Sequence, residues 1–283
     1  MKFKAICTDI DGTLLNAERE LSPATLDILR RAKERVPLIL ASSRMPAAMR
    51  HLQAELGILG SPLVCYNGGY VIHFPEGATE PVVLHSTPIP LEACKAIHQL
   101  AQGTEVHVSL YHADEWYVPA QDQWAAREAN NTKVQPTLAD FEEVFADWAA
   151  RGIGAHKVMC MGPADEIEAI TQHLAAHFGE TLNLYRSKPT YLEIAHRSIS
   201  KRTALQLLLD HVYPLQWEDL VAFGDNYNDI EMLEAVGLGV AVGNAKDEVK
   251  EISNYVAAAG KEDGVAHTVR RLLDGEDPAN WVD

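Results

Sequence analysis

Apolar residues in the first third of the chain form short runs, each of which ends at polar residues. Between these runs the apolar positions repeat at helical spacing instead. The expected strands lie at 3–9, 36–42 and 62–68, and the expected helices lie at about 22–35 and 46–56. Strands that alternate with helices are typical of βαβ units, so this third predicts a parallel sheet.

The same alternation returns in the last third of the chain. Its expected elements are a helix at 201–211, a strand at 220–225, a helix at 229–235, a strand at 237–242, a helix after residue 245, a short strand at 254–258 and a last helix that ends at Leu273. The middle of the chain differs. Its expected elements are strands at 105–111, 115–119 and 156–162 and a helix at 163–178.

These patterns predict an α/β fold with two domains. We expect a doubly wound, Rossmann-like parallel sheet core formed by residues 1–85 and 187–283, and an inserted α+β cap domain formed by residues 86–186. Proline and glycine in segments 74–81 and 86–90 make these the expected places where the chain passes from core to cap. Residues 274–283 are expected to form a polar tail.

Charge and composition exclude several classes of protein. The chain of 283 residues holds 24 Lys and Arg against 40 Asp and Glu, a net charge of −16, so we expect no nucleic acid as a partner. The four cysteines show neither zinc-ligand nor disulfide spacing. No stretch approaches the roughly 18 apolar residues of a membrane-spanning helix, so we expect a cytoplasmic protein with no membrane partner.

Polar residues follow several of the predicted strands. Because ligands bind beyond the carboxyl ends of parallel strands, we expect these residues to converge. Asp9 and Asp11 lie two apart, and one carboxylate could attack phosphorus while the other handles a proton. A hard cation would offset their repulsion of a phosphate, and Asp225 is the expected remote ligand.

Four sequence blocks occur in order: DIDGT at 9–13, LASSR at 40–44, a lysine at 201 and GDNYND at 224–229. With them the chain resembles the haloacid dehalogenase superfamily along nearly its whole length. The NGG at 67–69 and the insert of about a hundred residues resemble the Cof-like phosphatases with a type IIB cap.

The resemblance implies a catalytic role for four of the matching residues. Asp9 would be the nucleophile and a magnesium ligand. Asp11 would act first as general acid and then as general base, and its backbone carbonyl would also reach the metal. Lys201 would neutralise the charge of the phosphate and of the nucleophile, and Asp225 would bind Mg²⁺.

Other matching residues would hold the phosphoryl group. The resemblance implies that Ser42 and the backbone of Ser43 bind its oxygens and that Asn228 and Asp229 complete the surrounding network. Arg44 either contacts phosphate or anchors its loop by an ion pair. Asn67 could cap a turn, contact substrate, or do both.

Two positions depart from the family's pattern. Ser43 stands where the family commonly has glycine, and Arg202 follows the lysine where glycine is common. Ser43 lacks the freedom of glycine at positive φ, so the sequence does not determine the backbone geometry of this loop.

The sequence therefore predicts a magnesium-dependent phosphatase that hydrolyses phosphomonoesters of small metabolites, such as sugar phosphates, through an aspartyl phosphate. One alternative is a phosphomutase, which would return the phosphoryl group to another hydroxyl. A second alternative is a phospho-acceptor sensing module. The second acid, Asp11, favours turnover over sensing, because an acceptor does not need it.

Overall fold

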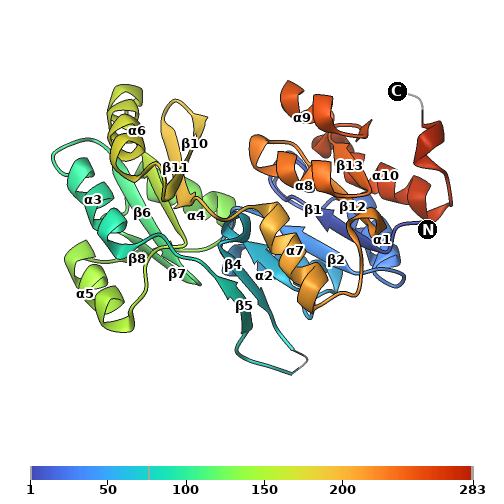
Figure 1. The fold of residues 1–283 in the computed structure, drawn as a ribbon, viewed down its shortest axis with the longest axis horizontal. Helices are drawn as coiled ribbons and strands as arrows, with labels where there is room; N and C mark the ends of the chain where they lie inside the picture. The colour runs from blue at the N-terminus through green and yellow to red at the C-terminus, as the bar shows by residue number, and fades with distance from the viewer. Residues whose placement is uncertain (1, 76, 282–283) are drawn as a thin grey trace. The chain divides into compact units, whose positions relative to one another are not determined.

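The computed structural model describes residues 2–75 and 77–281 (Figure 1). The chain divides into two compact units. The first unit comprises Met1–Ser43, Met49–Leu84 and Ser200–Asp283, and the second comprises Arg44–Ala48 and His85–Ile199. Within the described residues, no helix has both the length and the apolar character needed to cross a membrane.

A sheet of eight described strands forms the centre of the first unit, in the order β14-β13-β12-β1-β2-β3-β4-β5. The strands are β1 (Ala5–Thr8), β2 (Leu38–Ala41), β3 (Leu63–Cys65), β4 (Tyr70–His73), β5 (Val82–Ser86), β12 (Leu220–Gly224), β13 (Leu238–Ala241) and β14 (Tyr255–Val256). The strands from β14 to β3 run parallel, which confirms the predicted α/β class.

The central strand β1 separates two directions of winding. Ala5 pairs with Leu220 of β12 on one side, and Ile6 pairs with Leu38 of β2 on the other. The chain winds outward through β2 and β3 in one direction and through β12, β13 and β14 in the other. This reversal is a topological switch point, the place where open parallel sheets bind ligands.

Helices of the first unit lie around this sheet. They are α1 (Pro23–Ala32), α2 (Ala47–Leu56), α7 (Lys201–His211), α8 (Ile230–Ala235), α9 (Asp247–Ile252) and α10 (Gly264–Leu273), with short 3₁₀ helices η1 (Tyr66–Gly68), η2 (Trp217–Asp219), η3 (Tyr227–Asp229), η4 (Gly260–Glu262) and η5 (Pro278–Asn280). Ser22 caps α1 by accepting a hydrogen bond from the Thr25 amide, and Pro23 begins the helix as the sequence predicted. Leu205 of α7 and Leu233 of α8 pack in one buried cluster with strand residues such as Ala5.

The segment 74–81 has a different place from the one expected. It joins β4 to β5, which are neighbours in the first sheet, and β3 pairs with β4 in antiparallel orientation. Glu76, within this segment, lies outside the described residues. Proline and glycine mark a turn, but they do not distinguish a link between neighbouring strands from a passage between domains.

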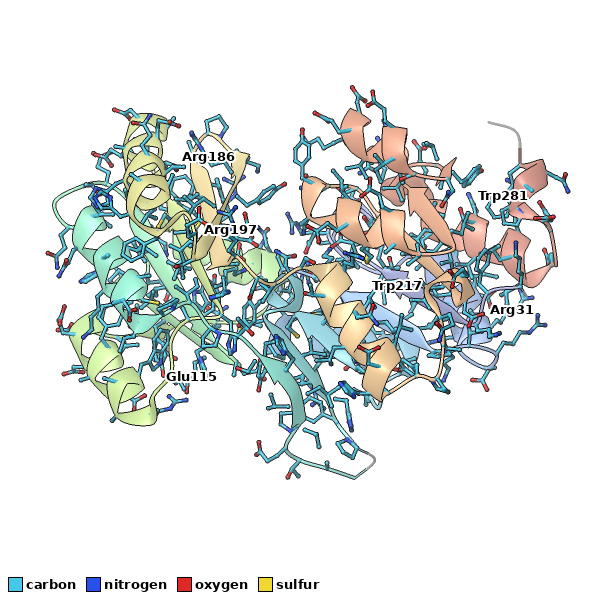
Figure 2. The ribbon with its side chains drawn as sticks, in the orientation of Figure 1. Arg31, Glu115, Arg186, Arg197, Trp217 and Trp281 are labelled. Atoms are coloured by element: carbon cyan, nitrogen blue, oxygen red, sulfur yellow. The ribbon has the colours of Figure 1, made fainter. Side chains whose placement is uncertain are left out.

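The tail is held to the first unit by its aromatic residue. Figure 2 labels this residue, Trp281. The centre of its ring lies 4.8 Å from the centre of the Tyr255 ring and 4.3 Å from the guanidinium of Arg271. The last two residues of the expected tail, 282 and 283, lie outside the described residues. Trp281 therefore anchors the described part of this segment.

The second unit contains a six-stranded sheet in the order β10-β11-β9-β6-β7-β8. Its strands are β6 (His107–His112), β7 (Glu115–Val118), β8 (Thr137–Leu138), β9 (Lys157–Met161), β10 (Leu182–Lys188) and β11 (Tyr191–His196), and its helices are α3 (Leu91–Ala101), α4 (Gln123–Thr132), α5 (Phe141–Arg151) and α6 (Ala164–Phe178). Apolar residues of α3, α5 and α6 form one buried cluster with residues of this sheet, including Val108 and Ile194.

The end of the second unit differs from the sequence prediction. The sequence predicts that residues 187–199 belong to the core, whereas contacts group them with the second unit up to Ile199. The reason is strand pairing, because β11 lies between β10 and β9 and is antiparallel to both. An apolar run directly before a core helix does not reveal which sheet it joins.

A buried histidine lies inside the second unit. Nδ1 of His156 accepts a hydrogen bond from the Ala113 amide at 3.0 Å, so Nε2 carries the proton and donates it to Oγ of Ser86 at 2.9 Å. The ring of His112 stacks on that of His156 with centroids 4.6 Å apart. These contacts satisfy the neutral form of His156.

Candidate active site

The predicted site residues of the first unit lie where strands and helices begin or end. Asp9 follows β1, Ser42 follows β2, and Asn67 lies in η1 directly after β3. Asp225 follows β12, and Lys201 is the first residue of α7. The parallel register of β1, β2 and β12 brings the ends of these strands to one edge of the sheet.

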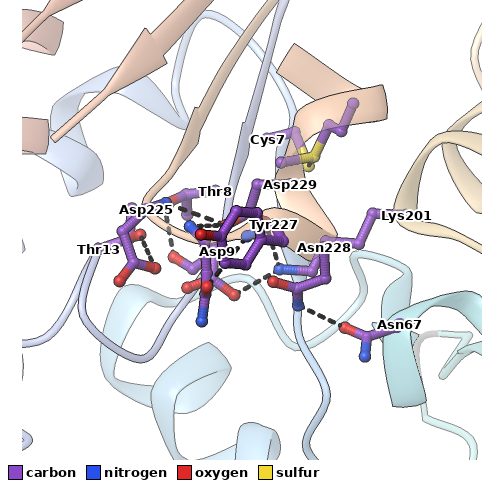
Figure 3. A network of polar contacts seen from close by, with 12 residues as sticks. Cys7, Thr8, Asp9, Thr13, Asn67, Lys201, Asp225, Tyr227, Asn228 and Asp229 are labelled. Atoms are coloured by element: carbon purple, nitrogen blue, oxygen red, sulfur yellow. Dashed lines mark hydrogen bonds and ion pairs between the residues drawn. The ribbon is translucent and has the colours of Figure 1, made fainter. Parts of the chain in front are cut away.

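Lys201 is the central cation of this edge (Figure 3). Its side chain is fully buried, and Nζ donates to Oδ1 of Asp9 at 2.5 Å and to Oδ1 of Asp229 at 2.6 Å. Ser200 and Thr203 form a capping box that begins α7 at this lysine. The first turn of the helix therefore fixes the ammonium between two carboxylates.

Burial and charge act on these groups in opposite directions. Burial alone would lower the pKa of Lys201, but the charges of Asp229 and Asp9 outweigh it and raise that pKa, so the ammonium stays charged. Burial raises the pKa of Asp9, and the charge of Lys201 opposes that shift.

Asp9, Asp225 and Asp229 form a carboxylate cluster in which one oxygen from each residue lies within 4.8 Å of the others. Burial, followed by the charge of Asp229, raises the pKa of Asp225 to about 6. A donor set made only of carboxylate oxygens suits a hard cation such as Mg²⁺ and gives a softer metal no nitrogen or sulfur ligand. The residues of this cluster therefore fit the expected cation.

The three carboxylates are not equally available to a cation. Oδ2 of Asp229 accepts hydrogen bonds from the amides of Asp225 and Asn226, both at 3.0 Å, while Oδ1 accepts from Lys201. N–H donors thus engage both oxygens of Asp229. Asp9 and Asp225 would therefore be better ligands for a cation than Asp229, whose carboxylate instead contacts the loop after β12 and the ammonium.

Gly12 and Thr13 determine where the Asp225 side chain lies. Oγ1 of Thr13 donates to Oδ1 of Asp225 at 3.2 Å. Gly12 has a φ of +86°, and a Cβ added there would lie 2.5 Å from Oδ2 of Asp225. The tight turn after β1 therefore needs glycine both for its backbone and for its closeness to this carboxylate.

Asn244 ties the same turn to another loop. Its Nδ2 donates to the Gly12 carbonyl at 2.8 Å, and its Oδ1 accepts from the Gly260 amide at 2.8 Å. Sequence reasoning gave no role to Thr13 or Asn244. The side chain of Asn244 follows β13 by three residues, so the rule that polar residues after strands converge could have identified it.

Asp11 has different surroundings from Asp9. Its side chain is 39% exposed, and its Oδ1 accepts a hydrogen bond from Nη1 of Arg19 at 3.1 Å. It is not a member of the carboxylate cluster around Lys201. A cavity of about 280 Å³ lies beside it and is also lined by Gly12, Arg19, Asn244 and Lys261, among others.

Ser42, Asn67 and Asn228 are linked by hydrogen bonds. The Asn67 amide donates to the Ser42 carbonyl at 2.9 Å, and Nδ2 of Asn228 donates to Oδ1 of Asn67 at 2.9 Å. Asn67 adopts a left-handed conformation with φ of 56°, which asparagine tolerates better than most residues. The structure thus brings three of the proposed phosphate-binding residues together, with Ser43 next to Ser42 in the chain.

Arg44 is placed differently from the other predicted residues. It belongs to the short piece Arg44–Ala48 that groups with the second unit, and its Nη1 donates to the Ala48 carbonyl at 3.0 Å. The side chain is buried. This contact is a hydrogen bond to a backbone carbonyl, so the expected ion pair and the contact with phosphate both stay predictions.

A parallel sheet with clustered aspartates and a buried lysine at its switch point places this edge among the ligand-binding sites of open α/β proteins. Residues 6–269 match the family of haloacid dehalogenase-like hydrolases. The chain belongs to this family, which confirms the predicted superfamily.

Two relatives cover almost the whole chain. The chain is 30% identical over 271 residues to the 5-amino-6-(5-phospho-D-ribitylamino)uracil phosphatase YitU of Bacillus subtilis. The matched region covers 95% of this chain and 97% of that protein. It is also 29% identical over 276 residues to the pyridoxal phosphate phosphatase YbhA of Escherichia coli. Here the matched region covers 95% of this chain and 98% of that protein.

Two solved structures share the fold. A haloacid dehalogenase-like hydrolase from Bacteroides thetaiotaomicron superposes with a TM-score of 0.84 at 28% identity, covering 96% of this chain and all of that one. A sugar phosphatase of subclass IIB superposes with a TM-score of 0.77 at 22% identity, covering 95% of this chain and 99% of that one. The second likeness concerns the fold alone, and it agrees with the predicted type IIB cap.

Proposed function

We propose that this protein is a magnesium-dependent phosphatase that hydrolyses phosphomonoesters of small metabolites through an aspartyl phosphate on Asp9. The observation that supports this most directly is the position of Asp9. Its carboxylate lies at the switch point of the sheet and accepts a hydrogen bond from the buried ammonium of Lys201. One of its oxygens lies within 4.8 Å of an oxygen of Asp225. The two relatives are named as phosphatases of small phosphorylated metabolites, which supports the same substrate class.

In the first step a carboxylate oxygen of Asp9 attacks phosphorus and the bond to the ester oxygen breaks. Asp11 donates a proton to the departing alcohol. Lys201 offsets the charge of the nucleophile and of the phosphoryl group. Ser42, the Ser43 backbone and Asn228 are the proposed donors to the phosphoryl oxygens, while Asn67 positions Asn228 through their hydrogen bond.

In the second step water attacks phosphorus and Asp9 is released as a carboxylate. Asp11, deprotonated in the first step, takes the proton of this water. Asp9 and Asp225 would hold Mg²⁺, which supplies electrostatic stabilisation of the phosphoryl oxygens when bound. The return of Asp11 to its protonated form completes the cycle.

The direct test is release of inorganic phosphate from a panel of phosphorylated metabolites, with Mg²⁺ and with excess chelator. Asp9→Asn should lower kcat by several orders of magnitude, because it removes the nucleophile while changing little volume. Asp27→Asn, on the exposed face of α1, is the matched control and should keep full activity.

The products separate the proposal from its alternatives. A phosphomutase would give an isomerised phosphate ester without free phosphate, and a sensing module would give a long-lived phospho-protein. Absence of phosphate release across a broad panel, or activity above a few percent in Asp9→Asn after deamidation is excluded, would contradict the proposed function.

A further inference from the structure

The turn at residues 16–20, just after the DIDGT block, is held closed by Asn16. The Asn16 amide donates to the Glu20 carbonyl at 3.0 Å, and Oδ1 of Asn16 accepts from the amides of Glu18 and Glu20 at 3.1 and 2.9 Å. The Arg19 amide donates to the Asn16 carbonyl at 3.1 Å. One side chain thus fixes the backbone on both sides of Arg19.

Arg19 has an uncommon backbone conformation in this turn. Its φ is 62°, in the left-handed region, which a residue with a Cβ adopts at a cost of about 1 kcal/mol or more. Its guanidinium reaches Oδ1 of Asp11 at 3.1 Å, eight residues earlier in the chain. The turn and the conformation of Arg19 together give the guanidinium this position.

The carboxylate that Arg19 contacts needs a fixed direction if it transfers protons. Proton transfer requires Asp11 within hydrogen-bond reach of both the departing oxygen and the attacking water. Asp11 is 39% exposed and lines the cavity described above, so solvent can reach it. Asp9, in contrast, is held by a buried lysine.

We propose that Arg19 is a positioning residue that holds the carboxylate of Asp11 in the orientation needed for proton transfer. This inference rests on the proposed function, because it gives Arg19 a task only if Asp11 acts as acid and base. Arg19 touches neither the nucleophile nor the phosphoryl group in this scheme. It acts through Asp11.

A double-mutant cycle tests the proposal. The four proteins are the wild type, Arg19→Gln, Asp11→Asn and the double variant, and rapid quench measures the first turnover onto Asp9. With a sugar phosphate, Arg19→Gln should slow this step roughly tenfold. This is more than the loss of an exposed ion pair alone would cause and less than the displacement of a catalytic group would cause. In the Asp11→Asn background the same change should have an effect of less than about twofold.

The leaving group gives a second readout that a merely structural role would not produce. Nitrophenolate departs without a proton, so with p-nitrophenyl phosphate Arg19→Gln should slow the first turnover by less than about threefold. Arg19→Lys should restore part of the rate with the sugar phosphate. KM should change less than kcat, because Arg19 does not contact substrate in the proposed scheme.

Arg151→Gln is the matched control. Arg151 is 40% exposed and pairs with Glu115 at 2.8 Å in the second unit, so it has a similar ion pair without a proposed role. Equal slowing by Arg19→Gln with and without Asp11, or no slowing at all, would overturn the positioning role while leaving the phosphatase intact. A wild type that releases no phosphate from any substrate would overturn the proposed function and this inference together.

Discussion

The ion pairs around the proposed nucleophile, Asp9, and the proposed acid, Asp11, differ mainly in their burial. The side chains of Lys201 and Asp229 are fully buried and that of Asp9 is 8% exposed, whereas Arg19 and Asp11 are 45% and 39% exposed. Charges interact strongly in the interior, where water does not screen them, and weakly at the surface. In the proposed mechanism, Lys201 with Asp9 and Asp229 therefore supports both folding and chemistry, while the exposed pair of Arg19 and Asp11 affects only the orientation of one side chain.

Lys201→Met should give the largest effect on stability. It leaves Asp9 and Asp229 buried without their cation, so the free energy of unfolding should fall by about 3–5 kcal/mol. Urea denaturation at neutral pH measures this loss. Mg²⁺ should restore part of the stability, because a bound cation again offsets the carboxylates. A loss below about 1 kcal/mol would show that the buried pair behaves like an exposed one.

His156 extends the comparison from buried carboxylates to a buried imidazole. Burial, with smaller effects of His112 and His85, lowers the pKa of His156 to about 3. Between about pH 6.5 and pH 3 the unfolded chain binds a proton here that the folded chain does not, so stability falls as pH falls through this window. The loss is at most about 1.4 kcal/mol per pH unit.

Urea denaturation at several pH values checks the contribution of His156. The slope of stability against pH below 6.5 should be smaller in His156→Gln than in the wild type. His211→Gln changes an exposed histidine and should leave the slope unchanged. Equal slopes in the wild type and His156→Gln would mean that other groups cause the acid sensitivity.

Gly12→Ala and Gly103→Ala together distinguish backbone strain from disturbance of the carboxylate cluster. Gly103 has a φ of +77° with nothing within 4 Å of an added Cβ, so Gly103→Ala meets only the backbone cost. Gly12→Ala meets the same cost and also displaces Asp225, so its loss of stability should be greater by about 1–2 kcal/mol. Its Mg²⁺ activation constant should rise, while that of Gly103→Ala should not. Equal Mg²⁺ activation constants in the two variants would show that Asp225 does not take part in metal binding.

Arg19→Gln should have the smallest effect on stability. An exposed ion pair contributes about 0–1 kcal/mol, and salt screens it further. Thermal unfolding at low and high salt should therefore show little difference from the wild type. A loss near that of Lys201→Met would show that Arg19 supports the fold rather than only Asp11.

The sequence predicted the parts of the site that follow from strand order. Asp9, Ser42, Asn67 and Asp225 each come directly after an apolar run, so their convergence could be inferred before the structure. Local pattern also identified the beginning of α1 at Ser22 and Pro23. The structure agrees with the inferred convergence of Asp9, Ser42, Asn67 and Asp225, while the chemical roles of these four residues stay predictions.

Features that depend on tertiary contacts could not be predicted from local pattern. The side chain of Arg19 reaches Asp11 only because of a left-handed turn that its own residue type does not favour. The sheet to which β11 belongs depends on its pairing with β9. The three N–H donors to Asp229 likewise come from two separate segments of the chain, which only the fold brings together.

The central position of β1 has a consequence for how the protein is made. Its partner β12 begins 215 residues after it, at Leu220 opposite Ala5, so a chain growing on the ribosome holds β1 without this neighbour until those residues have been made. The continuous stretch His85–Ile199 is complete before then and can fold first. Lys201 follows Asp9 by 192 residues, so a translation product that ends between them lacks the buried ammonium beside the Asp9 carboxylate.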